Sequence, residues 1–302
     1  MENKFSFADY ALLVLLAVIF GSSFMMTKIS LQSLSPMFLV SLRLVVAAIL
    51  LTTIMVAAGK WFPKGRIWFA LTGVSFFGHT LPFSLLSWGQ QTVDAGLAAI
   101  LMATMPLFTL FLAQVFTNDE KPNRYSVAGF ATALVGIVIL FGPEKLASLA
   151  DQSLRQYAVM LAAMSYGVNA IITKHLVDLP WQQTTASFMV VAFLLSLPLL
   201  LLEDLSFLSA SFVEWGAAVY SGIMPTALGA VLIVLIVRRT SASFLSQINF
   251  LVPLFGVAFS IVFLREVLPA NGVLALLIIL AGVALARRRP KSEILSFNKG
   301  VS

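Results

Sequence analysis

Residues 95–116 read AGLAAILMATMPLFTLFLAQVF, and they lie between Asp94 and the polar segment TNDEKP at 117–122. An apolar run of this length can cross a bilayer, which takes about 20 residues in a helix. Pro106, near the middle of the run, removes one backbone hydrogen bond and predicts a bend. The stretch therefore predicts a kinked transmembrane helix.

The same construction returns 147 residues later, over 241–269. Seven of the 29 aligned positions are identical, and each copy carries Pro-Leu-Phe followed by an acidic residue at matched spacing. The first copy has Pro106 and Asp119, and the second has Pro253 and Glu266. This match predicts a duplicated membrane unit.

The composition supports a membrane protein. Apolar residues make up 60% of the chain and charged residues 11%, whereas a soluble domain has about 25% charged residues. So few charges cannot cover a water-facing surface, which leaves a multi-spanning membrane protein. The chain has no cysteine, and this excludes disulfides, thiol catalysis and cysteine-ligated metals.

The apolar runs predict ten helices, separated by polar or proline-containing breaks. They are expected at 8–28, 36–58, 66–90, 95–117, 124–141, 155–174, 183–202, 212–237, 242–264 and 270–286. With both termini on one side of the membrane, that side carries fourteen lysines and arginines and the other side four, while Arg43 lies inside a span. The positive-inside rule then places both termini in the cytoplasm.

Each half of the duplication has five predicted helices, so the second copy is expected to enter the membrane in the opposite orientation. The first helices of the two halves agree at a shift of 146. Phe20, Ser23 and Thr27 then match Tyr166, Asn169 and Thr173. These positions share one helix face, which is too polar for lipid and is expected to look into the protein or a cavity.

With these features the chain resembles the drug/metabolite transporter superfamily, and its EamA-like branch in particular. The residues that carry the resemblance are Pro106-Leu107 with Asp119-Glu120, Gly129 and Gly136 in the first half, Pro253-Leu254 with Glu266 and Gly282 in the second, and Pro36 with Leu42-Arg43 in the second helix. The second half departs from this pattern, because Met189 stands at the position that matches Arg43.

The resemblance implies an all-α integral membrane protein of ten transmembrane helices, arranged as two inverted five-helix repeats around a central cavity. The repeats are expected at 1–144 and 145–290, and residues 291–302 as a mobile cytoplasmic tail. It also implies a multi-pass exporter of the bacterial inner membrane. The expected substrates are small metabolites, above all amino acids including aromatic ones, moved by alternating access with broad specificity.

The expected partners are therefore an amino-acid substrate and the lipid bilayer, with no nucleic acid, metal or cofactor. A monomer and a homodimer both stay open. An exporter of multiple drugs or of other metabolites on the same fold is the alternative function.

Polar and aromatic residues within the predicted spans are the candidates for substrate binding. They are His79, Phe20, Ser23, Phe24, Trp88, Tyr166, Asn169, Tyr220, Ser243, Ser246 and Asn249. Five further residues are expected to shape or gate the helices: Arg43, Pro82, Pro106, Pro225 and Pro253.

His79 is the one histidine predicted at membrane depth, and an ionisable group there is a candidate for function. Its alternative role is a hydrogen bond between helices.

Arg43 can attract a substrate carboxylate, but the sequence favours a structural role in which it bonds the carbonyls of a neighbouring helix end. Ser243, Ser246 and Asn249 follow helical spacing and predict either a cavity wall or packing through small residues. Trp88 lies near the outer interface, where aromatic residues are common.

The sequence argues against the competing classes. A serine protease within the membrane would need a Gly-x-Ser-Gly motif. The stretch ending in Ser221-Gly222 has Val219 at the first glycine, and Gly21-Ser22-Ser23-Phe24 lacks the final glycine. No HExxH motif of a metalloprotease occurs either, so an intramembrane protease is not indicated. The sequence has no pattern of charged residues that would form the ring of a channel filter, so a channel is not indicated. None of the thirteen acidic residues lies deep in a predicted span, so a carboxylate proton relay is not expected.

Overall fold

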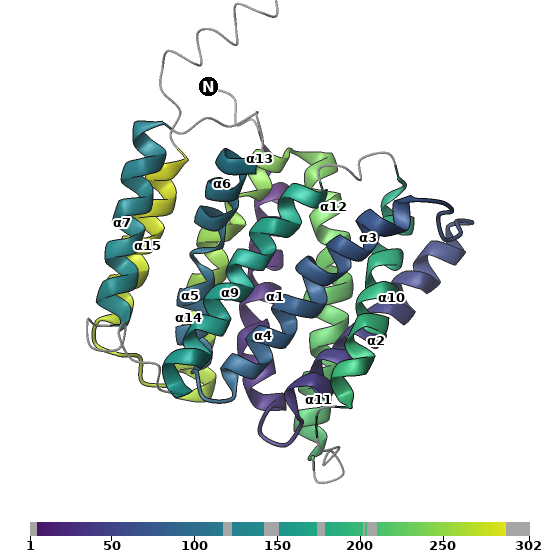
Figure 1. Ribbon diagram of the computed structural model, residues 1–302, viewed down its shortest axis with the longest axis horizontal. Coiled ribbons are helices and arrows are strands. Elements are labelled where there is room, and N and C mark those ends of the chain that lie inside the picture. The colour runs from purple at the N-terminus through teal and green to yellow at the C-terminus, as the bar shows by residue number, and fades with distance from the viewer. Residues whose placement is uncertain are drawn as a thin grey trace, which may run out of the picture.

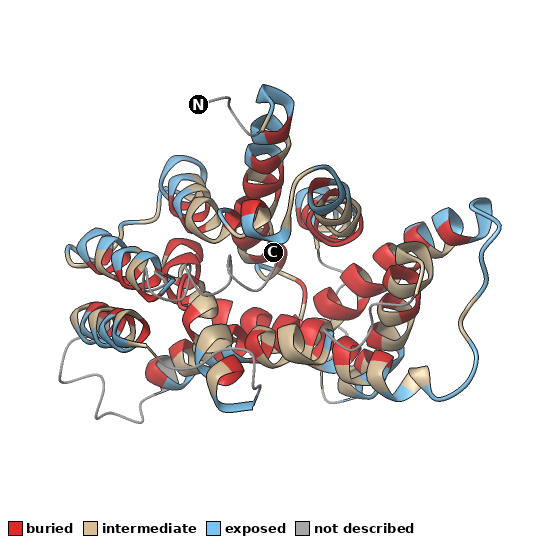
Figure 2. Ribbon diagram, turned by 90° about the horizontal axis from the view of Figure 1, so that it is seen from above, coloured by how far each residue is buried: buried red, intermediate tan, exposed pale blue. Residues whose placement is uncertain are grey.

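The structure, a computed structural model, describes residues 5–116, 123–141, 151–173, 179–201, 203 and 210–287. All regular elements within these ranges are helices, and no strand occurs among them. The helices form a bundle, seen from the side in Figure 1 and from above in Figure 2. The expected all-helical class is confirmed.

The bounds of the helices follow the apolar runs closely. The first half contains α1 (Phe7–Ser30), α2 (Pro36–Ala57), α3 (Ile67–Ser75), η1 (Phe76–Thr80), α4 (Leu81–Gln90), α5 (Ala95–Met102), α6 (Met105–Phe116) and α7 (Arg124–Phe141). The second half contains α9 (Asp151–Thr173), α10 (Trp181–Leu200), α11 (Phe212–Ser221), η3 (Gly222–Leu228), α12 (Gly229–Arg239), α13 (Ala242–Leu245), α14 (Ile248–Leu264) and α15 (Gly272–Ala286). Asp119, Glu120 and the tail at 291–302 lie outside the described residues.

Seven helical stretches of the described chain are long and apolar enough to cross a membrane. They are Phe7–Ser30, Pro36–Ala57, Ile67–Gln90, Ala95–Phe116, Trp181–Leu200, Phe212–Arg239 and Ala242–Leu264. The helices α7 and α15 are shorter apolar helices, and α9 is long but carries more polar residues.

Helices of the first half pack mainly on helices of the second half. The largest of these pairs are α7 with α15, α2 with α10, α1 with α14 and α4 with α9. Figure 1 shows α7 and α15 side by side at one edge of the bundle, with α2 and α10 at the other. The bundle core, red in Figure 2, lies between these edges.

Glycines let paired helices approach closely at equivalent positions. A Cβ atom on Gly136 would lie 3.1 Å from the Ala275 carbonyl oxygen, and one on Gly282 would lie 2.7 Å from the Gly129 carbonyl oxygen. Each residue of the first contact stands 146 positions from its counterpart in the second. The contact that α7 makes with α15 is therefore repeated by the contact that α15 makes with α7.

The first helix of each half makes a similar contact. Gly21 of α1 lies against Phe255 and Gly256 of α14, with 2.6 Å from a Cβ on Gly21 to Phe255 Cβ. Gly167 of α9 lies against Thr109 of α6, with 3.0 Å from a Cβ to the Thr109 nitrogen. Small residues are needed at both crossings, because backbone or Cβ atoms of the partner fill the space.

The third long helix of each half widens into a π-helix in its middle, at η1 and η3. A π-helical turn leaves main-chain carbonyls with altered partners, and hydroxyl side chains satisfy them here. Thr80 Oγ1 donates to the Ser75 carbonyl at 3.5 Å, and Thr226 Oγ1 donates to the Ser221 carbonyl at 2.8 Å. These two pairs also stand 146 residues apart.

Two of the expected continuous helices are interrupted. The stretch expected at 95–117 breaks at Ala103 and Thr104, and Pro106 takes the second position of α6, where its missing N–H costs nothing. The stretch expected at 242–264 breaks at Ser246 and Gln247, well before Pro253, and α14 continues through that proline. The two matched prolines therefore stand in different local structures, and the prediction of like kinks is wrong in detail.

Candidate functional site

Six helical elements bring polar and aromatic side chains together in a central cluster. We define the central cluster as Arg43, His79, Phe83, Tyr166, Phe188 and Thr226. Its members come from α2, η1, α4, α9, α10 and η3, so both halves of the chain contribute. The sequence predicted His79 and Tyr166 as binding residues, and these two lie together with Arg43.

His79 lies between two aromatic rings. Its imidazole stacks on Phe188 with 5.0 Å between ring centroids and 18° between planes, and it meets Phe83 edge to face at 5.8 Å. The Nδ1 atom is buried and makes no well-formed hydrogen bond with the described residues, although the Val74 backbone lies near the ring. A buried polar atom without a hydrogen-bond partner destabilises a protein interior. A bound ligand that donates to or accepts from this nitrogen would remove that cost.

Asn169 of α9 reaches the same place from the opposite side. A Cβ atom on Gly78 would come within 2.7 Å of Asn169 Cγ, so the amide lies directly against the backbone of η1 next to His79. Thr173 Oγ1 donates to the Asn169 backbone carbonyl at 2.8 Å and to its side-chain Oδ1 at 3.4 Å. The predicted polar face of α9 therefore turns into the bundle at Asn169, whereas Thr173 on the same face is exposed.

Arg43 is 7% exposed and stands on α2. Its Nε atom donates to Thr226 Oγ1 at 2.7 Å, and its guanidinium carbon lies 3.9 Å from the centroid of the Phe83 ring. The expected partners, carbonyl groups at a helix end, are wrong. The partner is a hydroxyl group of the π-helical segment of the other half, which is itself fixed by the Ser221 carbonyl.

The predicted face of α1 lies beside α11, α12 and α14. Phe20 packs on Gly229, and Phe24 packs on Gly256. Ser23 is 8% exposed, but the hydrogen bond to Tyr220 comes from its neighbour Ser22, at 2.9 Å between the hydroxyl oxygens. The prediction that this face turns inward is correct for Ser23, while Ser22 escaped the pattern because serine spacing alone does not show which hydroxyl finds a partner.

Trp88 lies apart from the central cluster. Arg155 donates to the Trp88 carbonyl at 2.6 Å and places its guanidinium carbon 4.0 Å from the centroid of the indole. The same guanidinium also donates to Gln91. Trp88 therefore belongs to a link between α4 and α9.

The predicted polar strip at 243–249 does not follow one continuous helix, because the break at Ser246 and Gln247 divides it. Ser243 is exposed, and Asn249 donates to the Ser246 carbonyl at 3.1 Å. Arg287 donates to the same carbonyl at 3.1 Å and to the Ser246 hydroxyl at 3.0 Å. The side chains of Asn249 and Arg287 therefore supply hydrogen bonds to the Ser246 carbonyl at the helix break.

Pro82 and Pro225 belong to the two π-helical regions. Pro82 lies in the first turn of α4, directly after η1, and Pro225 lies inside η3. Both are buried. Each lacks an N–H and so favours an altered hydrogen-bond pattern where the helix widens.

Charged groups gather at the end of the bundle where α1 ends and α5 begins. The Glu266 carboxylate accepts the backbone N–H groups of Ala95 and Gly96 at 2.9 and 3.0 Å, and so caps α5 from the other half. Lys28 Nζ donates to the carbonyls of Gln90 and Val93 at 2.9 and 3.0 Å. Glu266 is therefore a capping residue for a helix of the other half.

Asp94, directly before α5, lies within electrostatic range of both charges. Burial raises the pKa of its carboxyl, the Glu266 carboxylate raises it further, and Lys28 acts in the opposite direction. Protonation of Asp94 therefore relieves a repulsion at this end of the bundle.

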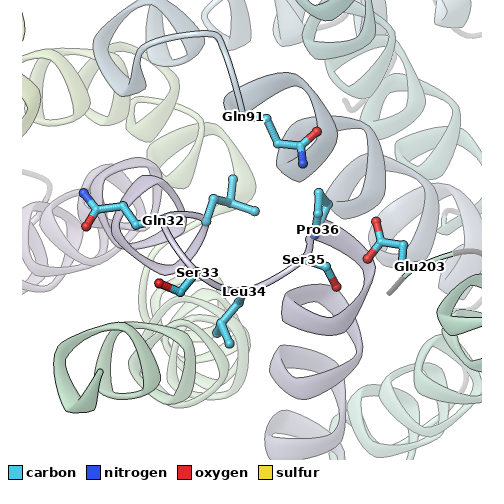
Figure 3. Close-up of a pocket in the computed structure, with 8 residues that line it drawn as sticks. Gln32, Ser33, Leu34, Ser35, Pro36, Gln91 and Glu203 are labelled. Atoms are coloured by element: carbon cyan, nitrogen blue, oxygen red, sulfur yellow. The ribbon is translucent and has the colours of Figure 1, made fainter. Parts of the chain in front are cut away.

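A pocket of about 340 Å³ opens at the same end, around the turn between α1 and α2 (Figure 3). It is lined by Leu31, Gln32, Ser33, Leu34, Ser35, Pro36, Gln91 and Glu203. The Glu203 carboxylate accepts the backbone N–H of Met37 at 2.9 Å and so caps α2. None of the predicted site residues lines this pocket, so we place the candidate site at the central cluster.

Comparison with known proteins agrees with this arrangement. The EamA-like transporter family matches residues 9–142 and 156–288. The chain belongs to the EamA-like transporter family. It is a multi-pass membrane protein and a transporter, as members of that family are.

Relatives of this EamA-like transporter include two with named substrates. A probable terminal-alkyne amino-acid exporter of Streptantibioticus cattleyicolor is 30% identical over 289 residues, which cover 95% of each chain. A probable amino-acid metabolite efflux pump of Salmonella typhimurium is 27% identical and covers 91% of this chain and 93% of its own length. A protein of known crystal structure shares the fold with a TM-score of 0.66 at 20% identity, over 93% of this chain and 97% of its own.

Proposed function

We propose that this transporter exports small metabolites, with amino acids, including aromatic ones, as its main substrates. The observation that carries the proposal is the central cluster, in which a guanidinium, an unpartnered imidazole nitrogen and three aromatic rings meet between the two halves. A zwitterion with an apolar side chain needs a cationic donor and ring faces of this kind. The names of the two relatives support the same substrate class.

We propose that substrate crosses by alternating access through a central cavity, with His79, Tyr166 and Asn169 in contact with it. Asn169 of α9 lies against the backbone of η1 beside His79, and Tyr166 and His79 each lie within electrostatic range of Arg43, so the two halves meet here. A rocking movement of one half against the other would change the contacts of such a cluster without unfolding either half. Phe20, Phe24 and Tyr220 extend the proposed lining along α1 and α11.

We further propose that residues 1–144 and 145–290 are inverted five-helix repeats, with ten transmembrane helices and both termini in the cytoplasm. Contacts repeated at an interval of 146 residues support the repeats, as does the match of the family to each half in turn. The charge bias supports the orientation in the plasma membrane.

Uptake of labelled amino acids by the purified protein in liposomes tests the function, with protein-free liposomes as the control. We expect several amino acids, aromatic ones among them, to be taken up faster than in the control. If no amino acid in the panel moves, the amino-acid proposal is wrong, and drugs or other metabolites become the substrates to test.

A further inference from the structure

Arg43 is a buried cation without an anionic partner among the described residues. The ion pair found within those residues joins Arg239 to Asp9 at 3.1 Å, far from Arg43 in the sequence and on other helices. A charge placed in a membrane-spanning helix is costly unless a partner or water compensates it. The second half offers a direct comparison, because Met189 takes the matching position on α10 and is 1% exposed. On α10 a buried methionine thus fills the position that an arginine takes on α2.

The surroundings of Arg43 fix the plane of its guanidinium. Thr226 Oγ1 accepts the Nε–H at 2.7 Å, and the Phe83 ring lies 3.9 Å below the guanidinium carbon. Thr226 is itself held by its bond to the Ser221 carbonyl. A guanidinium held at Nε and on one face presents its two terminal nitrogens as a rigid fork.

That fork has no hydrogen-bond partner in the described part of the chain. Its surroundings are Phe83 and, within electrostatic range, Tyr166 and His79, none of which is an acid. The geometry of a guanidinium fork matches a carboxylate, which it binds through two parallel N–H···O bonds.

We infer that Arg43 binds the carboxylate of the transported substrate, and that the site takes α-amino acids and other small carboxylates in preference to amines. The inference rests on the proposed transport function and names the group that the site recognises. Thr226 and Phe83 act as positioning residues that hold the fork. The α-carboxylate then lies at Arg43, and the side chain of the substrate lies among the rings of the central cluster.

The test uses the full-length wild-type protein in liposomes and the amino acid that it transports best. Competition by unlabelled compounds is measured for that amino acid, its methyl ester and its decarboxylated amine, which differ only at the carboxylate. We expect both analogues to compete about tenfold to a hundredfold less well than the amino acid, as charge-assisted bonds to arginine require. This comparison needs no variant and so does not depend on the folding of one.

Arg43→Met then copies the residue that the second half carries at this position, and Arg43→Lys keeps the charge without the fork. We expect Arg43→Met to lose the preference for the amino acid over its ester and amine, and Arg43→Lys to keep part of it. If Arg43 were purely structural, Arg43→Met would weaken the competition by all three compounds together and leave the ratio between them unchanged.

The outcomes separate this inference from the function on which it rests. Equal competition by the ester and the amine in the wild type would overturn the inference while amino-acid transport stands. A folded Arg43→Met protein with an unchanged ratio would overturn it as well. Absence of amino-acid transport by the wild type would overturn the proposed function and the inference with it.

Discussion

Arg43 Nε lies 2.7 Å from Thr226 Oγ1, and this hydrogen bond joins α2 of the first half to η3 of the second. The Thr226 hydroxyl in turn donates to the Ser221 carbonyl, so it links the guanidinium to the backbone of the π-helical segment. The matching threonine, Thr80, donates to the Ala192 carbonyl of α10 at 3.0 Å in addition to its longer bond of 3.5 Å to the Ser75 carbonyl. The same position thus serves a charged contact in one half and a neutral one in the other.

This difference predicts unequal effects of one substitution at two matched sites. Thr226→Val leaves the Nε–H of a buried cation without its acceptor, and we expect it to destabilise the protein by about 1–3 kcal/mol. Thr80→Val removes a neutral bond and is expected to cost about 1 kcal/mol. Thermal unfolding of both variants in detergent measures the difference. Equal losses, or a larger loss for Thr80→Val, would show that the contact with Arg43 carries no special weight.

The pairing of α7 with α15 predicts a strong effect of adding one methyl group. A Cβ on Gly129 would lie 2.5 Å from the nitrogen and the Cβ of Ala286, and backbone cannot move aside as a flexible side chain can. We expect Gly129→Ala to cost about 1–3 kcal/mol in the free energy of unfolding. Gly216→Ala is the control, since nothing lies within 4 Å of its added Cβ and helix propensity favours alanine there. A Gly129→Ala protein as stable as the control would contradict this packing.

The cap that Glu266 provides for α5 predicts a change in accessibility at that end of the bundle. Glu266→Ala leaves two N–H groups without their acceptor, and loss of a helix cap costs about 0.5–2 kcal/mol. Val93→Cys gives a single reporter at a position 2% exposed in a chain that has no cysteine. We expect Glu266→Ala to raise its alkylation by a membrane-impermeant maleimide about two- to thirtyfold.

Glu266→Gln keeps one acceptor oxygen and is expected to give an intermediate rate. If both variants alkylate as slowly as the reporter alone, the Glu266 carboxylate does not hold this end closed.

Asp94 predicts a pH dependence of stability whose sign follows from its raised pKa. The folded protein holds this proton more tightly than the unfolded chain, so stability falls as pH rises above the ordinary pKa of 3.8 and the loss is complete above the folded pKa. Asp94→Asn removes the repulsion from Glu266. We expect this variant to be more stable than the wild type at about pH 7, with a difference that shrinks towards about pH 4.

Melting temperatures of the two proteins across that interval measure the effect. A difference that stays constant, or that grows on acidification, would mean that Asp94 does not titrate against Glu266.

The sequence predicted the helices well because apolar runs and polar breaks determine where a chain can cross a bilayer. It failed to predict the helix breaks within 95–116 and 242–264, because the bends were expected at the prolines and not at Thr104 and Ser246. These breaks depend on local hydroxyl contacts and on Arg287, which is distant in the sequence. The π-helical segments were missed for a similar reason, although Ser75 with Thr80 and Ser221 with Thr226 repeat at an interval of 146 and offered a signal.

For the candidate site, the sequence selected His79 and Tyr166 because polar groups inside a span are rare. It could not select Phe83, Phe188 and Thr226, because phenylalanine and threonine are common in such helices and only the packing shows which ones meet His79 and Arg43. It misjudged the partner of Arg43 because that partner lies 183 residues away.

Counterflow of a labelled amino acid in liposomes, compared between the wild type and His79→Ala, tests most directly whether substrate passes the central cluster. Phe76→Ala is the matched control, since Phe76 lies on the same π-helical segment and is 38% exposed. Our account predicts counterflow in the wild type and in Phe76→Ala, and its loss in a folded His79→Ala protein. Full counterflow by His79→Ala, or an equal loss in Phe76→Ala, would contradict it.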